Sequence, residues 1–333
     1  MQKIKIKESP LFWPAKLAGS GRDRSLLVLD ETLLPGELKY IKIRNTQEAV
    51  EVIRQMKTRA FGQFLVVLNT FLLEIRNVET GLVSAEMLLN KIKNTAEALN
   101  NSRPTFPFSE VTGPVLHWAQ KAMEEKKDVS LTVAKNIEGY LRGIRIRRLE
   151  RVQKIADLIK DGDSILTHCN VSGELAMAAY ICRQQNKDIH FFATETRPFL
   201  QGAKLTCWEL KKMGASVTLI ADNAVASVMA DGLVNKVIVG SDRSCANGDF
   251  ANKIGTYQMA VLAQEFGIPF YALTQPSSRI KEGKDIPIEI RNDEELLAYS
   301  GKRIVEGNVR GFYPGFDVVP HEFIKESITI NVH

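Results

Sequence analysis

The sequence predicts an α/β protein in which a doubly wound parallel sheet follows a smaller, mostly helical domain with a small antiparallel sheet. From residue 164 onward, short β-branched runs alternate with helical patterns. This alternation is typical of a parallel sheet covered by helices on both faces. Before residue 161, helical patterns dominate instead. The length of 333 residues also suits two domains rather than one.

The N-terminal domain is predicted to span residues 1–130. The segments "SLLVLDETLLP" and "YIKIRN" indicate a small antiparallel pair of strands. Helical patterns follow at residues 46–57, 60–76, 85–99 and 106–126. A longer helical pattern, residues 131–160, is predicted to connect this domain to the next.

Residues 161–333 are predicted to form a Rossmann-like catalytic domain. Its expected strands are "SILTHCN", "IHFFATET", "SVTLIAD", "KVIVGSD" and "PFYALTQ". The expected helices between them lie at residues 173–185, 201–213, 223–230 and 252–266. In open sheets of this kind, ligands bind beyond the carboxyl ends of the strands. The residues at those ends are therefore the candidate site.

A thiol, carboxylates and an arginine occupy the expected strand ends: Cys169 after the first strand, Arg197 after the second, Asp222 after the third and Asp242 after the fourth. Cys169 is either functional or a small buried hydrophobic residue. Asp242 is either a general acid, with a pKa raised in an apolar crevice, or a turn carboxylate. Asp222 is expected to cap the following helix. Arg197 either binds phosphate or pairs with Glu195.

The remaining cysteines and the nearby histidine have plainer interpretations. Cys182, Cys207 and Cys245 are expected to be structural, and His168 to be a core residue. A catalytic pair of Cys169 and His168 is not expected, since neighbours on a strand face opposite sides. No cysteine pair has metal-ligand spacing. We therefore expect reduced thiols in a cytoplasmic protein and no bound metal.

The ligand is predicted to be a small phosphorylated molecule. No strand is followed by the glycine pattern of a dinucleotide site or a P-loop. Two expected helix starts, Ser172-Gly173 and Asn252-Lys253, could instead bind a simple phosphate. The net charge of +5, from 44 Lys and Arg against 39 Asp and Glu, fits such a substrate.

Nucleic-acid and membrane binding are not expected. The long helical pattern places four arginines on one stripe, which we interpret as a solvated face with ion pairs. They are Arg142, Arg145, Arg148 and Arg151. The most apolar stretch, residues 60–75, is interrupted by polar residues and is shorter than a membrane span, so a buried helix is predicted. The N-terminus shows no signal-peptide pattern.

Several long segments resemble the methylthioribose-1-phosphate isomerase family. They are "THCN", "ETRPFLQGAKLTCWEL", "TLIADNAVASVM" and "GSDRSCANGDFANKIGTY", with "VLDETLLP" and "NSRPT" nearer the N-terminus. The same superfamily includes ribose-1,5-bisphosphate and 5-deoxyribose-1-phosphate isomerases. It also includes the regulatory subunits of a translation-initiation guanine-nucleotide exchange factor, so a non-catalytic sugar-phosphate or nucleotide-binding subunit is a further alternative.

The resemblance implies a role for each matching residue. It implies catalytic roles for Cys169 and Asp242, and substrate-binding roles for Arg59, Ala60, Phe61, Arg103, Gln201, Asn252 and Lys253. The match is imperfect after Arg59, where the family pattern Arg-Gly-Ala-Pro is replaced by Arg-Ala-Phe-Gly. The segment after Cys169 also departs from the family pattern, reading Asn-Val-Ser-Gly. Both departures lie where the resemblance places the sugar-phosphate substrate. They therefore leave open which group the sugar carries at C5.

The implied activity is a cofactor-independent aldose–ketose isomerisation. A 5-substituted ribose 1-phosphate, with 5-methylthioribose 1-phosphate as first choice, would become the corresponding ribulose 1-phosphate. A paralogue acting on 5-deoxyribose 1-phosphate or ribose 1,5-bisphosphate is the alternative. The joint presence of Cys169 and Asp242 favours an enzyme over a regulatory subunit. The resemblance also implies a homodimer.

Overall fold

The computed structural model describes residues 7–77, 83–104, 106–275, 277 and 279–330. The chain forms two compact units. Pro10–Ile146 is the N-terminal unit, and the chain from Arg147 onward, with the segment before Pro10, is the C-terminal unit. The boundary lies within one helix, α5 (Val129–Leu158). The division of the chain into functional domains at residues 130 and 160 stays a prediction.

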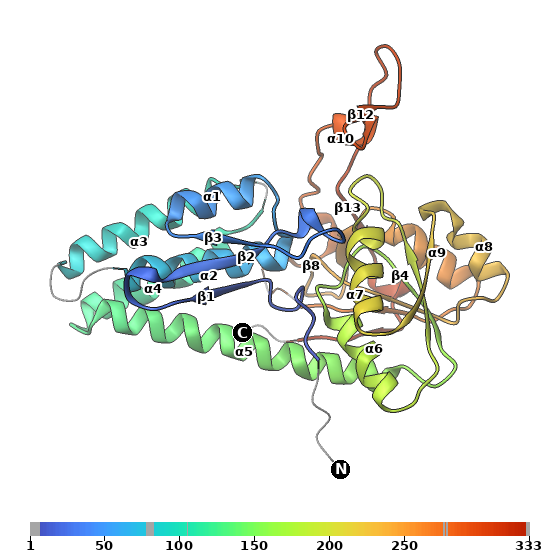
Figure 1. Cartoon of the computed structure of the whole chain (residues 1–333), viewed down its shortest axis with the longest axis horizontal. Helices are drawn as coiled ribbons and strands as arrows, with labels where there is room; N and C mark the ends of the chain where they lie inside the picture. Colours follow the sequence, from blue (N-terminus) through green and yellow to red (C-terminus); the bar gives the residue numbers. More distant parts are fainter. Residues whose placement is uncertain (1–6, 78–82, 105, 276, 278, 331–333) are drawn as a thin grey trace. The chain divides into compact units, whose positions relative to one another are not determined.

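The N-terminal unit combines a small antiparallel sheet with helices, as predicted (Figure 1). The sheet has the order β1-β2-β3, from β1 (Ala15–Ala18), β2 (Ser25–Leu29) and β3 (Tyr40–Ile43). β2 and β3 are the expected pair, whereas β1 was not predicted. The helices are α1 (Thr46–Arg54), α2 (Ala60–Arg76), α3 (Ala85–Asn100), α4 (Ser109–Glu124) and the first part of α5.

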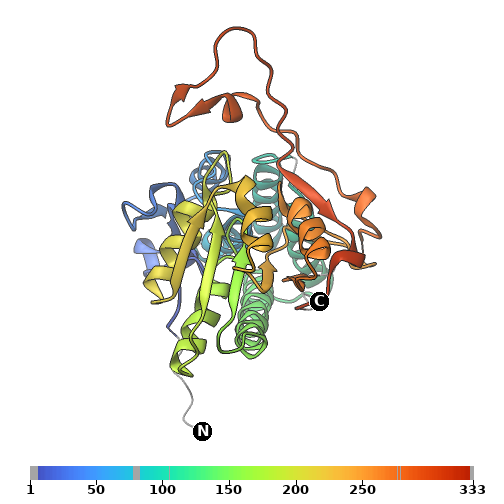
Figure 2. The ribbon, with the colours of Figure 1, turned by 90° about the vertical axis from the view of Figure 1, so that its right-hand side faces the viewer.

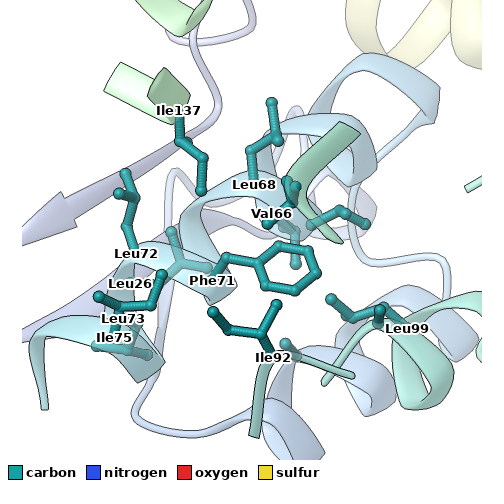
Figure 3. Packing of buried hydrophobic residues seen from close by; sticks show 14 of the residues in the cluster. Leu26, Val66, Leu68, Phe71, Leu72, Leu73, Ile75, Ile92, Leu99 and Ile137 are labelled. Atoms are coloured by element: carbon teal, nitrogen blue, oxygen red, sulfur yellow. The ribbon is translucent and has the colours of Figure 1, made fainter. Parts of the chain in front are cut away.

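The apolar helix α2 forms the centre of this unit. Figure 3 shows Phe71 of α2 among side chains from its neighbours, including Leu26 of β2 and Ile92 and Leu99 of α3. These residues are almost fully buried. The prediction of a buried helix is therefore confirmed. Within the described parts of the chain, no helix is long and apolar enough to cross a membrane.

The C-terminal unit is built on a six-stranded, all-parallel sheet. Figure 2 shows this unit facing the viewer. The strand order is β14-β10-β7-β4-β5-β6. The strands are β4 (Ser164–Thr167), β5 (His190–Thr194), β6 (Ser216–Ile220), β7 (Lys236–Val239), β10 (Phe270–Ala272) and β14 (Glu326–Ser327). The predicted doubly wound class is confirmed, and β14 is a sixth strand that the sequence did not indicate.

The connections of this sheet reverse direction between β4 and β7. From β4 the chain winds outward to β5 and β6, and from β7 it winds the other way to β10. Right-handed crossovers then require the connecting helices to cover opposite faces. Accordingly α6 (Glu174–Gln184) packs against α7 (Cys207–Lys212), and α8 (Val225–Ala230) packs against α9 (Thr256–Glu265). The junction of β4 and β7 is the switch point at which such folds bind ligands.

Further elements lie beyond the carboxyl ends of the strands. β8 (Arg243–Ser244), β9 (Phe250–Lys253) and β13 (Phe316–Val319) form a second antiparallel sheet. An arm that contains α10 (Glu294–Leu297), β11 (Ala298–Tyr299) and β12 (Lys302–Arg303) projects away from the parallel sheet in both views (Figures 1 and 2). The predicted helix 252–266 is therefore wrong at its start, since its first residues belong to β9.

Candidate active site

The two predicted catalytic residues follow the two strands at the switch point. β4 and β7 are paired directly, and Cys169 and Asp242 come two and three residues after their respective ends. The segments that carry them lie close together, because a Cβ built on Gly240 would lie 3.9 Å from the carbonyl oxygen of Asn170. Cys169 and Asp242 therefore lie on two segments that run close to each other after the ends of neighbouring strands.

The backbone at Cys169 has an unusual conformation that neighbouring side chains hold in place. Its φ is 59°, in the left-handed region that non-glycine residues rarely adopt. The N–H of Cys169 donates to Thr196 Oγ1 at 3.0 Å, and its carbonyl accepts from Thr206 Oγ1 at 2.5 Å. Ser172 also has a positive φ, of 46°. Strain of this kind persists where surrounding structure determines it and is common at functional sites.

A buried carboxylate supports the same loop from one side. The amide nitrogen of Asn170 donates to Glu209 Oε1 at 2.7 Å and to Thr206 Oγ1 at 3.0 Å. The amide oxygen of Asn170 accepts from the backbone N–H of Ser172 at 2.9 Å. Glu209 also accepts from the Ser9 hydroxyl at 2.9 Å. The loop that carries the thiol is thus fixed through Asn170.

Gln201 follows β5, the other neighbour of β4, and leads into a π-helical turn, Gly202–Thr206. Its side chain is buried, and its Oε1 atom has no hydrogen-bond partner among the described residues. The turn packs tightly on the strand end, because a Cβ on Gly202 would come within 1.7 Å of the Thr194 carbonyl oxygen. A buried, unpaired amide oxygen is costly unless a ligand satisfies it. This agrees with the predicted substrate-binding role of Gln201.

Asn252 and Lys253 lie on β9, not at a helix start. They pair with Asp317 and Phe316 of β13, about 64 residues further along the chain, so local sequence could not indicate the strand. Lys253 is 6% exposed, and its ammonium lies 4.9 Å from the centre of the Phe316 ring. It also lies 3.4 Å from the hydroxyl of Tyr313. Lys253 is therefore a buried cation held by aromatic rings.

The predicted phosphate cradle at the second helix start is occupied by the protein itself. α9 begins at Thr256, and Asp317 Oδ2 accepts from the N–H of Gly255 at 2.7 Å. Burial raises the pKa of Asp317 to about 6, against the backbone N–H donors that lower it. The first expected helix start differs: α6 begins at Glu174, after Gly173 with a φ of 83°, and no side chain caps it.

His168 is a structural residue, as expected. Its Nε2 lies 2.9 Å from the carbonyl oxygen of Ile254 and its Nδ1 lies 2.6 Å from Thr194 Oγ1. Burial lowers the pKa of His168 to about 4, so the ring is neutral at pH 7. The carbonyl requires the proton on Nε2, which leaves Nδ1 to accept from Thr194. His168 thus ties β4 to β5 and to the turn after Lys253.

The expected helix cap at Asp222 is wrong. Its two carboxylate oxygens accept instead from the backbone N–H groups of Thr196, at 2.6 Å, and Arg197, at 2.7 Å. Thr196 has a φ of 63° and supports Cys169 through its hydroxyl. The guanidinium of Arg197 donates to the Leu296 carbonyl and lies over the Tyr299 ring. Asp222 therefore stabilises the end of β5.

The other predicted substrate residues lie in the N-terminal unit, three of them at the start of α2 and Arg103 after α3. Arg59 precedes α2, Ala60 and Phe61 begin it, and no side chain caps it. The buried Gln63 donates to the Thr58 carbonyl at 3.0 Å and accepts from Arg103 at 3.1 Å. The structure therefore brings the Arg59 and Arg103 segments together through Gln63.

The motif "VLDETLLP" contributes a buried carboxylate to the same region. Glu31 Oε1 accepts from the Thr58 hydroxyl and, at 3.2 Å, from the backbone N–H of Arg59. Burial raises the pKa of Glu31, although the Thr58 hydrogen bond and the charge of Arg59 oppose this. Sequence reasoning noted the motif but assigned no role to Glu31.

The arginine stripe of α5 is not uniformly solvated, which corrects the sequence interpretation. Arg142 is exposed, but Arg148 and Arg151 are 2% and 7% exposed and pair with the buried Glu174 of α6. Sequence reasoning missed this cluster because Glu174 lies more than 20 residues away. It also missed Tyr313 and Asp317, whose proximity to β9 depends on long-range pairing.

No group of three His, Cys, Asp or Glu side chains in the described segments is placed to hold a metal ion. None of the four cysteines forms a disulfide in the structure.

Comparison with known proteins places the chain in a family. Residues 63–330 match the model of the initiation factor 2 subunit family. A methylthioribose-1-phosphate isomerase from Fervidobacterium nodosum is 38% identical over 98% of this chain and 94% of its own length. The chain belongs to the initiation factor 2 subunit family. The predicted resemblance is therefore confirmed.

Other members of this family are similar to the chain over nearly its whole length. A 5-deoxyribose 1-phosphate isomerase from Moorella thermoacetica is 37% identical, over 93% of this chain and 92% of its own. The crystal structure of 5-methylthioribose 1-phosphate isomerase from Pyrococcus horikoshii superposes with a TM-score of 0.82 at 32% identity. That alignment covers 98% of this chain and 94% of the other. Family members similar to this chain over nearly its full length thus include named sugar-phosphate isomerases.

Proposed function

We propose that the chain is a cofactor-independent aldose–ketose isomerase that converts 5-methylthioribose 1-phosphate into 5-methylthioribulose 1-phosphate. The observation that carries the proposal is the placement of Cys169 and Asp242 after the two strands of the switch point. It is supported by relatives named for this activity over nearly the full chain. The reaction moves one hydrogen from C2 to C1 and opens the ring, so an acid and a base are sufficient.

Ring opening is the first step that the two groups can perform. The substrate is locked as a ring because phosphate occupies the anomeric oxygen. Asp242, in its protonated form, donates a proton to the ring oxygen as the bond from that oxygen to C1 breaks. The ring oxygen leaves as the C4 hydroxyl, and the cation at C1 is stabilised by the oxygen that carries the phosphate. Asp242 is then a carboxylate, ready to accept a proton.

Hydrogen transfer follows by one of two balanced routes. In the first, the Cys169 thiolate removes the C2 proton to give an enediol phosphate, and the thiol returns that proton to C1. In the second, the C2 hydrogen moves to C1 with its electron pair as a hydride. In both routes the C2 hydroxyl proton goes to Asp242 as the ketone forms. We assign the substrate contacts to Arg59, Ala60, Phe61, Arg103, Gln201, Asn252 and Lys253.

Phosphorus NMR with four ribose 1-phosphates tests the proposed substrate. The panel contains the 5-methylthio, 5-deoxy, 5-phospho and unmodified sugars. Turnover of the 5-methylthio compound with the highest kcat/KM is expected. Turnover of the 5-deoxy or 5-phospho compound alone would overturn the choice of substrate, and no turnover of any would overturn the isomerase itself.

A second substrate is favoured by one observation on this chain. Ala60 and Phe61 stand where the family pattern has Gly-Ala, at the start of α2 beside Arg59. A relative with 37% identity is named 5-deoxyribose 1-phosphate isomerase. We therefore give 5-deoxyribose 1-phosphate as the alternative substrate, which the same panel distinguishes.

Deuterium at C2 of the substrate distinguishes the two routes of hydrogen transfer. A hydride shift retains the label at C1 of the product, whereas a thiol-mediated proton transfer exchanges part of it with water. Proton NMR of the product in ordinary water measures the retained fraction. Measurable loss of the label to water would overturn the hydride shift and support Cys169 as the base.

We also propose a homodimer that works in the reducing cytoplasm. Four cysteines without a disulfide are consistent with a reducing compartment. Light scattering coupled to size exclusion should give twice the mass of the chain. A mass equal to one chain would overturn the dimer.

A further inference from the structure

Three buried charged side chains lie behind the loop that carries Cys169. α5 supplies Arg148 and Arg151, three residues apart and therefore on one face of the helix. α6 supplies Glu174, the first residue after the loop. Arg148 is 2%, Arg151 7% and Glu174 1% exposed. All three belong to the C-terminal unit.

The two arginines share the one carboxylate and also reach the backbone. Arg148 Nε and Arg151 Nε donate to the two oxygens of Glu174, each at 2.5 Å. A second donor of Arg148 reaches the carbonyl of Ser172 at 2.8 Å. A second donor of Arg151 reaches the carbonyl of Thr274, just beyond β10, at 3.0 Å. One network therefore joins the Cys169 loop to the end of a neighbouring strand.

Stability alone is a poor explanation for this network. Three charges removed from water carry a desolvation penalty that their mutual attraction often fails to exceed. Although burial raises it, the charges of Arg151 and Arg148 hold the pKa of Glu174 below its usual value, so Glu174 is a carboxylate at neutral pH. The cluster also donates to the backbone carbonyls of Ser172 and Thr274.

The loop in front of the network needs external support. Cys169, Ser172 and Gly173 all have left-handed backbone conformations, with φ of 59°, 46° and 83°. Asn170 holds one side of this loop through Glu209, and Arg148 holds the other through Ser172. Such conformations persist only when several contacts determine them together.

We propose that Arg148, Arg151 and Glu174 are positioning residues that fix the backbone of the Cys169 loop and so orient the thiol. The proposal rests on the catalytic role assigned to Cys169. The three side chains act through Ser172 and Thr274 and not on the substrate itself. Their removal should therefore lower kcat much more than it raises KM.

Arg148→Met tests the proposal, because it keeps the length of the side chain and removes its donors. We expect kcat to fall by about 100-fold, the scale of a misplacement of about 1 Å, with KM changed less than about 3-fold. Arg148→Lys should recover part of this loss, since an ammonium can bond Glu174 or Ser172 but not both in the same fork geometry. If Arg148→Met does not fold, the kcat and KM of Arg148→Lys test the positioning role instead.

The matched control is Lys236→Met, which breaks a buried ion pair at the other end of the same sheet. Lys236 is 6% exposed, pairs with Asp163 and begins β7, far along the strands from Cys169. We expect it to destabilise the fold while kcat stays within about 2-fold of the parent. Equal kcat losses in Arg148→Met and Lys236→Met would overturn the positioning role.

Alkylation of Cys169 by iodoacetamide gives a readout that does not require turnover. Mass spectrometry of the peptide that contains residue 169 follows the rate, with the Cys182 peptide as an internal reference for unfolding. We expect Arg148→Met to change the Cys169 rate by about 10-fold and Lys236→Met to leave it unchanged. An unchanged rate in both would overturn the proposal. If Arg148→Met changes the alkylation rate of Cys169 but the parent protein turns over no ribose phosphate, the proposed isomerase activity is rejected, while the proposal that the cluster orients the thiol is kept.

Discussion

Left-handed backbone conformations occur at both ends of the six-stranded sheet, but partly different types of residue adopt them. At the amino side, where helices lead into strands, left-handed turns use Gly162, Asn186, Gly214, Gly232 and Gly267. Glycine and asparagine adopt this conformation at little cost. At the carboxyl side, where strands lead into helices, Gly173 and Gly255 adopt this conformation too, but so do Cys169, Ser172, Thr196 and Leu200. These side chains do not favour a positive φ.

The difference indicates where the chain requires a particular side chain in a costly conformation. Each such residue costs about 1–3 kcal/mol, and the cost persists where function or dense packing fixes it. Buried ion pairs are present at both sides, but their contacts differ. Lys236 bonds Asp163 and the carbonyl at the end of α5, which closes a helix. Arg148 and Arg151 bond the Cys169 loop and the end of β10.

Cys169→Ser and Asp242→Asn test the carboxyl side most directly. We expect each to reduce kcat by about a thousand-fold, since a positioned acid or base contributes ~10²–10⁴-fold. Binding should be largely retained, because neither change removes a proposed phosphate contact. Phosphorus NMR measures turnover and calorimetry measures the Kd. Cys207→Ser on α7 is the matched control and should keep the parent rate; near-normal turnover in either test variant would reject its role.

Lys236→Met tests the amino side, where we expect a loss of stability without a loss of activity. Removal of the ammonium leaves Asp163 buried without its counter-charge, which costs about 3–5 kcal/mol. Urea unfolding followed by circular dichroism measures the change. The double variant Lys236→Met with Asp163→Asn removes the unpaired charge and should recover part of the loss. A large fall in kcat for the folded Lys236→Met protein would contradict the division of roles.

Two glycines compare the packing at the two sides. Gly202→Ala would bring a methyl within 1.7 Å of the Thr194 carbonyl, so the end of β5 must move. We expect a cost of about 3 kcal/mol and reduced turnover, as overpacking costs typically ~1–3 kcal/mol. Gly232→Ala has open space but a φ of 66°, so it should cost only about 1–2 kcal/mol. Equal effects of the two on turnover would refute the comparison.

The sequence predicted the elements whose signals are local. Residues 60–76 are helical as predicted, and five of the six parallel strands were found from their β-branched runs. Cys169 and Asp242 could be placed at strand ends because parallel strands bring their carboxyl ends to one side. β9 and β14 were missed, since each is defined by a partner strand far away in the sequence.

The charges within the site were harder to predict than the strands. The spacing of Arg148 and Arg151 equally suits an exposed face, and only the distant Glu174 shows that the face is buried. A phosphate was expected at the start of α9, but the carboxylate of Asp317 accepts from the Gly255 N–H there. Asp317 is also distant in the sequence, so the local pattern could not indicate it. Asp222 resembles a helix cap locally, yet its carboxylate bonds the end of β5. Pairing over long distances decides each case.

The smallest expected effect is the dependence of fold stability on pH, because His168 and Asp317, two buried groups at the carboxyl side, change it in opposite directions. The pKa of His168 is about 4 in the folded chain, below its unfolded value of 6.5, so the unfolded state binds more protons between these values. Stability therefore falls as the pH falls, by about 2 kcal/mol between pH 7.5 and 5. The pKa of Asp317 is about 6, above its unfolded value of 3.8. The folded state then binds more protons, and stability rises by about 1 kcal/mol over the same range.

Two variants separate these contributions. On acidification from pH 7.5 to pH 5, His168→Asn should lose less stability than the parent. The reason is that the variant lacks the imidazole whose protonation in the unfolded state causes that loss. Asp317→Asn keeps an acceptor for the Gly255 N–H and should show a steeper loss on acidification than the parent. Urea midpoints at the two pH values measure both. Parallel pH profiles in all three proteins would show that neither group changes its proton affinity on folding, and the carboxyl side would then lack the buried titrating pair that distinguishes it.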